Sequence, residues 1–114
     1  MSYTIWHNPR CSKSRQTLQI LEENNIEAEV VKYLESEPTE DEIRDILKKL
    51  NISAKELLRV DEEQAKMLKL KDVEDEGVII RAMSRFPKLI QRPIVIKGDK
   101  AVLGRPPEKV LELI

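Results

Sequence analysis

The stretch "SYTIWHNPRCSKSRQTLQILEENNIEAEVVKY", residues 2–33, decides the fold because it places one helix pattern between two strand patterns. Residues 2–7 are short and rich in β-formers, which favours a strand that the following "NPR" segment ends. The spacing of apolar residues predicts a helix from Ser12 to about Glu23, and residues 27–33 predict a second strand. Two strands joined in this way are usually parallel, with a right-handed crossover.

The middle of the chain predicts helices. Two of them begin with a capping box, in which a Ser or Thr and a Glu three residues later bond to each other's backbone N–H groups. The pairs are Thr39 with Glu42 and Ser53 with Glu56. The expected helices cover residues 38–50, 53–59, 62–70 and 75–86.

The end of the chain returns to strand patterns. Residues 92–98 predict a strand that opens on a proline, and residues 101–104 predict its hairpin partner across a turn at residues 99–100. Prolines at helix-entry positions predict a closing helix over residues 106–114.

This order of elements, β-α-β, then helices, then β-β-α, is that of an α/β protein with a thioredoxin-like layout. We expect a mixed four-stranded sheet. We also expect a single domain over residues 1–114. A helical insertion over about residues 38–87 would separate the βαβ half from the ββα half.

Composition narrows the classes of function. The 114 residues carry a net charge of only −1, which does not indicate a large nucleic-acid-binding face. Neither a membrane span nor a signal peptide is recognisable. The single cysteine excludes an internal disulfide and agrees with a reducing compartment, so we expect a cytoplasmic monomer without nucleic-acid or membrane partners.

Cys11, the only cysteine, falls where the first strand ends and the first helix begins. Unpaired backbone N–H groups and the helix dipole favour a thiolate there and provide a seat for a tetrahedral oxyanion. His7, the only histidine, would stabilise the thiolate further if it were protonated. Hydroxyl groups and cations surround the cysteine, on Arg10, Ser12, Lys13, Ser14, Arg15 and Thr17. A buried, inert thiol is the commoner state of a lone cysteine, but its place at a strand-to-helix turn favours a reactive one.

Three arginines stand out by context. Arg59 ends a short capped helix, Arg92 precedes Pro93, and Arg105 precedes two prolines. Each one alone is more often a solvated surface charge. Together with the oxyanion seat they indicate a clamp, because a tetrahedral dianion needs several fixed cations and a guanidinium bonds two oxygens at once. From the residues alone, the peptide bond before Pro93 is expected to be trans.

The segments "YTIWHNPRCSKSRQTL", "YLESEPTEDEIRDIL", "ISAKELLR", "RPIVI" and "GRPPEKVLELI" resemble the arsenate reductase family that uses glutathione and glutaredoxin. The resemblance runs from residue 3 to residue 114. It implies that Cys11 is the catalytic cysteine of an HNPxC motif, that His7 lowers its pKa, and that Ser14 is the serine three residues later. It also implies a substrate-binding triad of Arg59, Arg92 and Arg105, and a structural cis-proline at Pro93.

The resemblance implies a reaction as well. The Cys11 thiolate would attack arsenate, with Ser14 and backbone N–H groups holding the oxyanion. Glutathione would act as co-substrate, and glutaredoxin would clear the resulting mixed disulfide. No metal and no bound cofactor are needed.

Two other functions remain open at this point. A glutathione-dependent thiol reductase with another substrate would need the same thiol but not three converging arginines. A non-enzymatic regulator that binds RNA polymerase would use a C-x-x-C switch, and here that segment reads Cys11-Ser12-Lys13-Ser14.

Overall fold

The computed structural model describes residues 2–114. The chain forms two compact units. The sheet unit comprises residues 2–36 and Arg92–Ile114, and the helical unit comprises Glu37–Gln91. The described helices include none that is long and apolar enough to cross a membrane.

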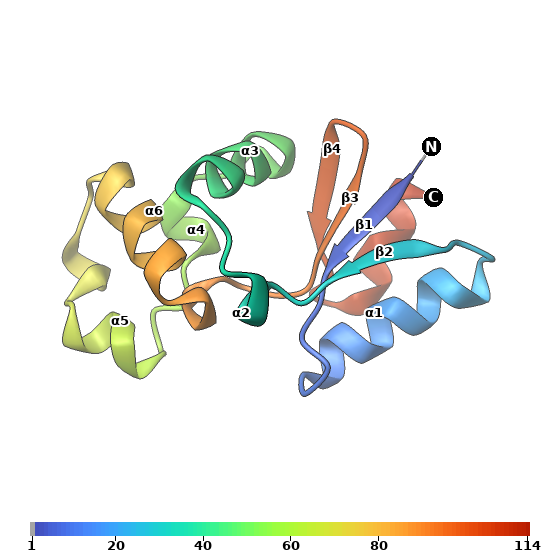
Figure 1. The fold of residues 1–114 in the computed structure, drawn as a ribbon, viewed down its shortest axis with the longest axis horizontal. Helices are drawn as coiled ribbons and strands as arrows, with labels where there is room; N and C mark the ends of the chain where they lie inside the picture. The colour runs from blue at the N-terminus through green and yellow to red at the C-terminus, as the bar shows by residue number, and fades with distance from the viewer. Residues whose placement is uncertain (1) are drawn as a thin grey trace. The chain divides into compact units, whose positions relative to one another are not determined.

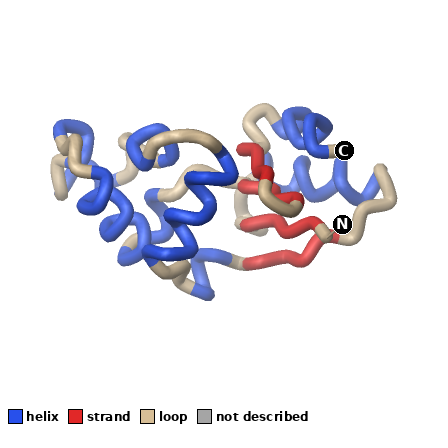
Figure 2. The backbone as a smooth tube through the Cα atoms, turned by 90° about the horizontal axis from the view of Figure 1, so that it is seen from above, coloured by secondary structure: helices blue, strands red, loops and turns tan. Residues whose placement is uncertain are grey.

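The sheet unit contains all four strands of a mixed sheet, as the sequence predicted. Strand β1 pairs in parallel with β2 and antiparallel with β3, and β3 pairs antiparallel with β4, so the order is β2-β1-β3-β4. Figures 1 and 2 show these strands and the helices of the unit. The elements are β1 (Tyr3–Trp6), α1 (Ser12–Glu23), β2 (Ala28–Val31), α2 (Tyr33–Ser36), β3 (Ile94–Lys97), β4 (Lys100–Leu103) and the 3₁₀ helix η3 (Pro107–Leu113).

One face of the sheet is covered by α1 and η3, which pack against each other (Figure 1). Ile5 of β1 and Val95 of β3 are directly opposed in the register and fully buried. Leu21 of α1 and Val110 of η3 cover them. Burial of four such side chains stabilises the unit by roughly 1.5–3 kcal/mol each, and it fixes how α1 lies on the sheet.

The hairpin turn differs from the prediction by one residue. Lys97 pairs with Lys100, so the two-residue loop is Gly98-Asp99 and not residues 99–100. Gly98 has a φ of 61°, a left-handed conformation that glycine adopts without steric cost. The need for this conformation at the first loop position sets the register of the two strands.

Two further segments differ from their expected form. The second strand ends at Val31 rather than at residue 33, and the chain turns at once into the short helix α2. The closing helix is a 3₁₀ helix over Pro107–Leu113, not a longer helix over residues 106–114.

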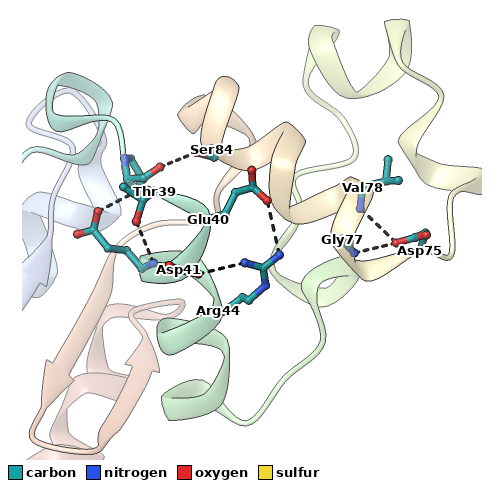
Figure 3. A network of polar contacts seen from close by, with 10 residues as sticks. Thr39, Glu40, Asp41, Arg44, Asp75, Gly77, Val78 and Ser84 are labelled. Carbon is teal, nitrogen blue, oxygen red and sulfur yellow. Dashed lines mark hydrogen bonds and ion pairs between the residues drawn. The ribbon is translucent and has the colours of Figure 1, made fainter.

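The helical unit begins its helices largely as predicted. Both capping boxes are present, Thr39 with Glu42 and Ser53 with Glu56. Figure 3 shows the first of them, together with Arg44 between Glu40 and Asp41 and the hydroxyl of Ser84 donating to the carbonyl of Pro38. The helices are α3 (Glu40–Leu50), α4 (Ala54–Leu57), α5 (Glu63–Met67), η1 (Leu70–Asp72), α6 (Glu76–Arg85) and η2 (Pro87–Leu89).

A short antiparallel pairing that the sequence did not reveal closes the helical unit. Leu58 forms an isolated β-bridge with Ile90. The Arg59 N–H donates to the Leu89 carbonyl at 2.8 Å, and the Gln91 N–H donates to the Leu57 carbonyl at 3.0 Å. This pairing fixes the backbone at Arg59.

Replacing Gly104 with alanine should lower the free energy of unfolding by about 1–3 kcal/mol, as overpacking usually does. A Cβ atom at this position would lie 2.5 Å from Thr17 Oγ1 and 2.8 Å from Pro93 Cγ. Thr17 cannot easily move away, because it is fully buried and its hydroxyl donates to the Lys13 carbonyl at 2.8 Å. Urea unfolding followed by circular dichroism measures the change.

Gly77→Ala is the matched control for this substitution. Its Cβ atom would meet only Asp75 Oδ1, at 3.3 Å, in the first turn of α6. This side-chain oxygen caps α6 and has to move by only a few tenths of an ångström, so the unfolding midpoint should change much less than in Gly104→Ala. Equal midpoints for Gly104→Ala and the unaltered protein would contradict the close packing of Gly104.

Candidate active site

Cys11 is the N-cap residue of α1. Its backbone is extended, with φ −95° and ψ 123°, and its carbonyl accepts the N–H of Arg15 at 3.0 Å as the first hydrogen bond of the helix. The thiol is half-buried, so the cysteine stands at the start of the helix as the sequence predicted.

Asn8 organises the loop that leads into Cys11. Its backbone carbonyl accepts the Cys11 N–H at 2.9 Å, and its side-chain Oδ1 accepts the Arg10 N–H at 3.1 Å. Arg15 Nη1 donates to the Pro9 carbonyl at 2.9 Å. Asn8 was not among the predicted site residues, and its signal in the sequence is that asparagine before proline commonly starts a turn.

The pKa of the Cys11 thiol is lowered by its surroundings. Burial acts in the opposite direction and raises the pKa. The backbone N–H of Ser14, the charge of the Arg92 guanidinium and the backbone N–H of Lys13 outweigh that effect. Since each of these groups stabilises a negative sulfur, the thiolate becomes accessible at a lower pH than for an ordinary cysteine.

His7 and Ser14 form a buried pair beneath the loop. His7 Nδ1 lies 2.6 Å from Ser14 Oγ, and the Asn8 N–H donates to the same hydroxyl at 3.0 Å. Ser14 is fully buried. Its hydroxyl therefore links His7 to the loop backbone, and its expected role in holding the oxyanion stays a prediction.

Thr17 corrects the sequence analysis. It is fully buried, and its hydroxyl is bonded within the helix instead of serving the oxyanion seat. Ser14, Thr17 and Leu21 follow one another at helical spacing on the buried face of α1. That spacing in the sequence was the signal that the two hydroxyls point inward.

The pKa of His7 is lowered, first by burial and then by the positive charges of Lys32 and Arg15. Neutral imidazole is thus favoured near pH 7, and His7 is not among the groups that lower the pKa of Cys11. The structure therefore gives no support to a protonated His7 beside the thiolate.

Arg92 is brought to Cys11 by the strand pairing. Trp6 at the end of β1 opposes Ile94 at the start of β3, so the residues just before β3 lie beside the loop that follows β1. The peptide bond between Arg92 and Pro93 is cis, as the family resemblance implied. Arg92 Nε and Nη1 are buried and have no hydrogen-bond partner among residues 2–114.

Buried nitrogen donors without partners, such as Nε and Nη1 of Arg92, are costly, because they have given up water and gained no hydrogen bond in return. An anionic ligand would give hydrogen-bond partners to these two donors, which belong to a cation beside a thiol of lowered pKa. The arrangement therefore fits an oxyanion at the thiol.

Arg105 lies at the same end of the hairpin. The Gly104 N–H donates to the Pro93 carbonyl at 2.9 Å and extends the β3–β4 pairing by one step, which places Arg105 at the position next to Arg92 along the ladder. Arg105 is exposed, and its side chain has no hydrogen bond or ion pair within the described residues 2–114.

Arg59 belongs to the helical unit. Its Nη1 lies 2.8 Å from Glu62 Oε1 and donates to the Lys88 carbonyl at 3.3 Å. The convergence of Arg59, Arg92 and Arg105 on one anion stays a prediction. Across residues 2–114 no group of three or more His, Cys, Asp or Glu side chains could hold a metal ion.

Comparisons with known proteins agree with the fold. The model of the ArsC family matches residues 6–113. The chain is 52% identical to the uncharacterized protein YfgD of Escherichia coli K12 over 96% of this chain and 94% of that protein. It is 43% identical to an arsenate reductase of Haemophilus influenzae over the full length of both. A solved arsenate reductase from Vibrio cholerae superposes with a TM-score of 0.97 at 43% identity, covering 100% of this chain and 98% of that one.

Proposed function

Since the chain belongs to the ArsC family, we propose that it is an arsenate reductase that converts arsenate to arsenite at Cys11. The buried, unpartnered Nε and Nη1 of Arg92 carry this proposal, because they offer a fixed cation to an oxyanion beside a thiol of lowered pKa.

The first step is nucleophilic attack. The Cys11 thiolate forms a bond to the arsenic(V) of bound arsenate, and one arsenate oxygen leaves as water after taking up protons. The backbone N–H groups of Lys13 and Ser14, which already favour a negative sulfur, and the Arg92 guanidinium offset the charge of the oxyanion. His7 and Ser14 hold the loop in place from below.

The second step needs a thiol from outside, since the chain has one cysteine. The thiolate of glutathione attacks the Cys11 sulfur, and a sulfur–sulfur bond forms while the sulfur–arsenic bond breaks. The electron pair of that bond passes to arsenic, which leaves as arsenite. Glutaredoxin then takes the glutathione by thiol–disulfide exchange and restores Cys11. A reducing compartment such as the cytoplasm would supply both glutathione and glutaredoxin.

A coupled assay tests this function. Arsenate, glutathione, glutaredoxin, glutathione reductase and NADPH are combined with the protein, and NADPH oxidation and arsenite are both measured. We expect oxidation that requires arsenate and glutathione, with one arsenite formed per NADPH consumed. Turnover of a glutathionylated peptide with none of arsenate would contradict the proposal and favour a thiol reductase.

A further inference from the structure

A cavity of about 270 Å³ lies in the sheet unit beside the active-site loop. It is lined by residues 7–10 and by Lys32, Leu34 and Glu35. Its place follows from the sheet: Trp6 is paired with Val31, so the segments that follow the parallel strands β1 and β2 leave the same edge together. Figure 1 shows β2 running into α2 at this edge. Ligands of α/β proteins commonly bind at the carboxyl ends of such strands.

A neighbouring hollow lies along β2. This second hollow, of about 530 Å³, shares Lys32 and Glu35 with the first and is also lined by Val30, Val31 and Ser36. Ligand pockets commonly measure about 300–1,000 Å³, so the first hollow, at about 270 Å³, has room for part of a small peptide beside the active-site loop. Pro9 and Arg10, which line the first hollow, directly precede Cys11 in the chain.

Three charged side chains surround the first hollow without being used by the fold. Those of Arg10, Lys32 and Glu35 form no hydrogen bond or ion pair with any residue in the described range 2–114. Two cations and one carboxylate give this wall a net charge of +1. A ligand with two carboxylates and one ammonium group, of net charge −1, is its complement.

We propose that this cavity is the binding site of the outside thiol, a small peptide thiol with the charges of glutathione. The carboxylates of the ligand pair with Arg10 and Lys32, its ammonium group pairs with Glu35, and its thiol passes over Pro9 to the Cys11 sulfur. The proposal rests on the proposed function only in its premise that an outside thiol must reach Cys11. An uncharged thiol would bind less well in this cavity, because it could not pair with Arg10, Lys32 and Glu35.

A reaction without arsenate tests the site. Ellman's reagent first places a thionitrobenzoate group on Cys11 as a mixed disulfide. Glutathione thiolate then attacks the Cys11 sulfur, a Cys11–glutathione disulfide forms, and thionitrobenzoate leaves as a coloured thiolate that carries the electron pair of the broken bond. The rate is measured with glutathione and with uncharged 2-mercaptoethanol, and their ratio is the selectivity for the charged peptide thiol.

Lys32→Glu should reduce this selectivity by about tenfold, because one favourable pair becomes a repulsive one. Taking the ratio to 2-mercaptoethanol cancels any change in Cys11 itself, such as one transmitted from Lys32 through His7. Lys109→Glu is the matched control, since Lys109 is an exposed residue of η3 in the same unit and does not line the cavity. It should leave the selectivity within about twofold.

Glu35→Gln distinguishes specific binding of glutathione in the cavity from attraction of the glutathione anion by the positive charge of the wall. The substitution makes the wall more positive, so attraction by net charge alone would speed the reaction with glutathione. If Glu35 holds the ammonium group, the same substitution should instead slow it by about threefold. Glu29→Gln, at an exposed position of β2 outside the lining, is the control.

A faster reaction of Glu35→Gln, or equal selectivity in Lys32→Glu and Lys109→Glu, would overturn the proposal. So would a thiol that Ellman's reagent cannot label, because Cys11 would then be closed to outside thiols. Since arsenate takes no part in these measurements, failure of arsenate reduction and failure of this site would be seen separately.

Discussion

Cys11→Ser should abolish arsenate reduction, with a fall in turnover of at least about a thousandfold, as is usual when an enzyme loses its nucleophile. The serine hydroxyl does not ionise near neutral pH, even with the Lys13 and Ser14 N–H groups beside it. It also cannot form the sulfur–sulfur bond by which electrons reach arsenic. Arsenite formation in the coupled assay measures the loss.

The loss must not arise from misfolding. Cys11 is the N-cap residue of α1, and serine is a preferred N-cap, so the variant should be at least as stable as the unaltered protein. Gln19→Ala, at an exposed position of the same helix, should retain full activity. Arsenate-dependent NADPH oxidation that survives in Cys11→Ser would rule out the proposed mechanism.

Arg92→Ala should lower kcat/KM for arsenate by about a hundredfold, the usual effect of removing a charged donor from an oxyanion. It should also raise the pKa of Cys11, because the Arg92 charge is one of the groups that lower it. The alkylation rate of Cys11 follows the thiolate, so it rises with pH and is half-maximal at the pKa. For the unaltered protein we expect this midpoint below the ordinary value of about 8.5.

In Arg92→Ala the midpoint should move to higher pH. Arg81→Ala, which removes an exposed arginine of the helical unit, serves as the control and should leave both the midpoint and kcat/KM unchanged. Arg92→Lys should recover part of the pKa effect but less of kcat/KM, since lysine keeps the charge and loses the planar fork. An unchanged alkylation midpoint in Arg92→Ala would contradict the contact of Arg92 with the thiolate.

The predicted elements that matched best were those set by local signals. The helix over Ser12–Glu23 and the two capping boxes were located correctly, because the caps and the apolar spacing of a helix act within a few residues. The hairpin turn was displaced by one residue. Two adjacent pairs, Gly98-Asp99 and Asp99-Lys100, could each have formed the loop, and the pairing across β3 and β4 selects the first.

Features that depend on distant partners were missed or stay predictions. The bridge between Leu58 and Ile90 joins segments far apart in the chain, so neither segment carries a signal for it by itself. The oxyanion role of Ser14 was implied by the family resemblance and stays a prediction, whereas the burial of its hydroxyl against His7 is a feature of the fold. Which side of a helix meets the sheet decides where its hydroxyl points.

The sequence by itself determined that the protein has a mixed sheet with helices and that its single thiol lies at the start of a helix. It could do so because strand, turn and helix preferences are local. Only the tertiary structure decided what surrounds that thiol. Pairing of β1 with β3 brings Arg92 to Cys11 with two buried donors left open. Packing of α1 turns Ser14 and Thr17 inward, where their hydroxyls support the loop and the helix. Burial and unsatisfied hydrogen-bond donors are properties of the assembled fold. They distinguish an anion-binding site from polar residues that are merely close together in the sequence.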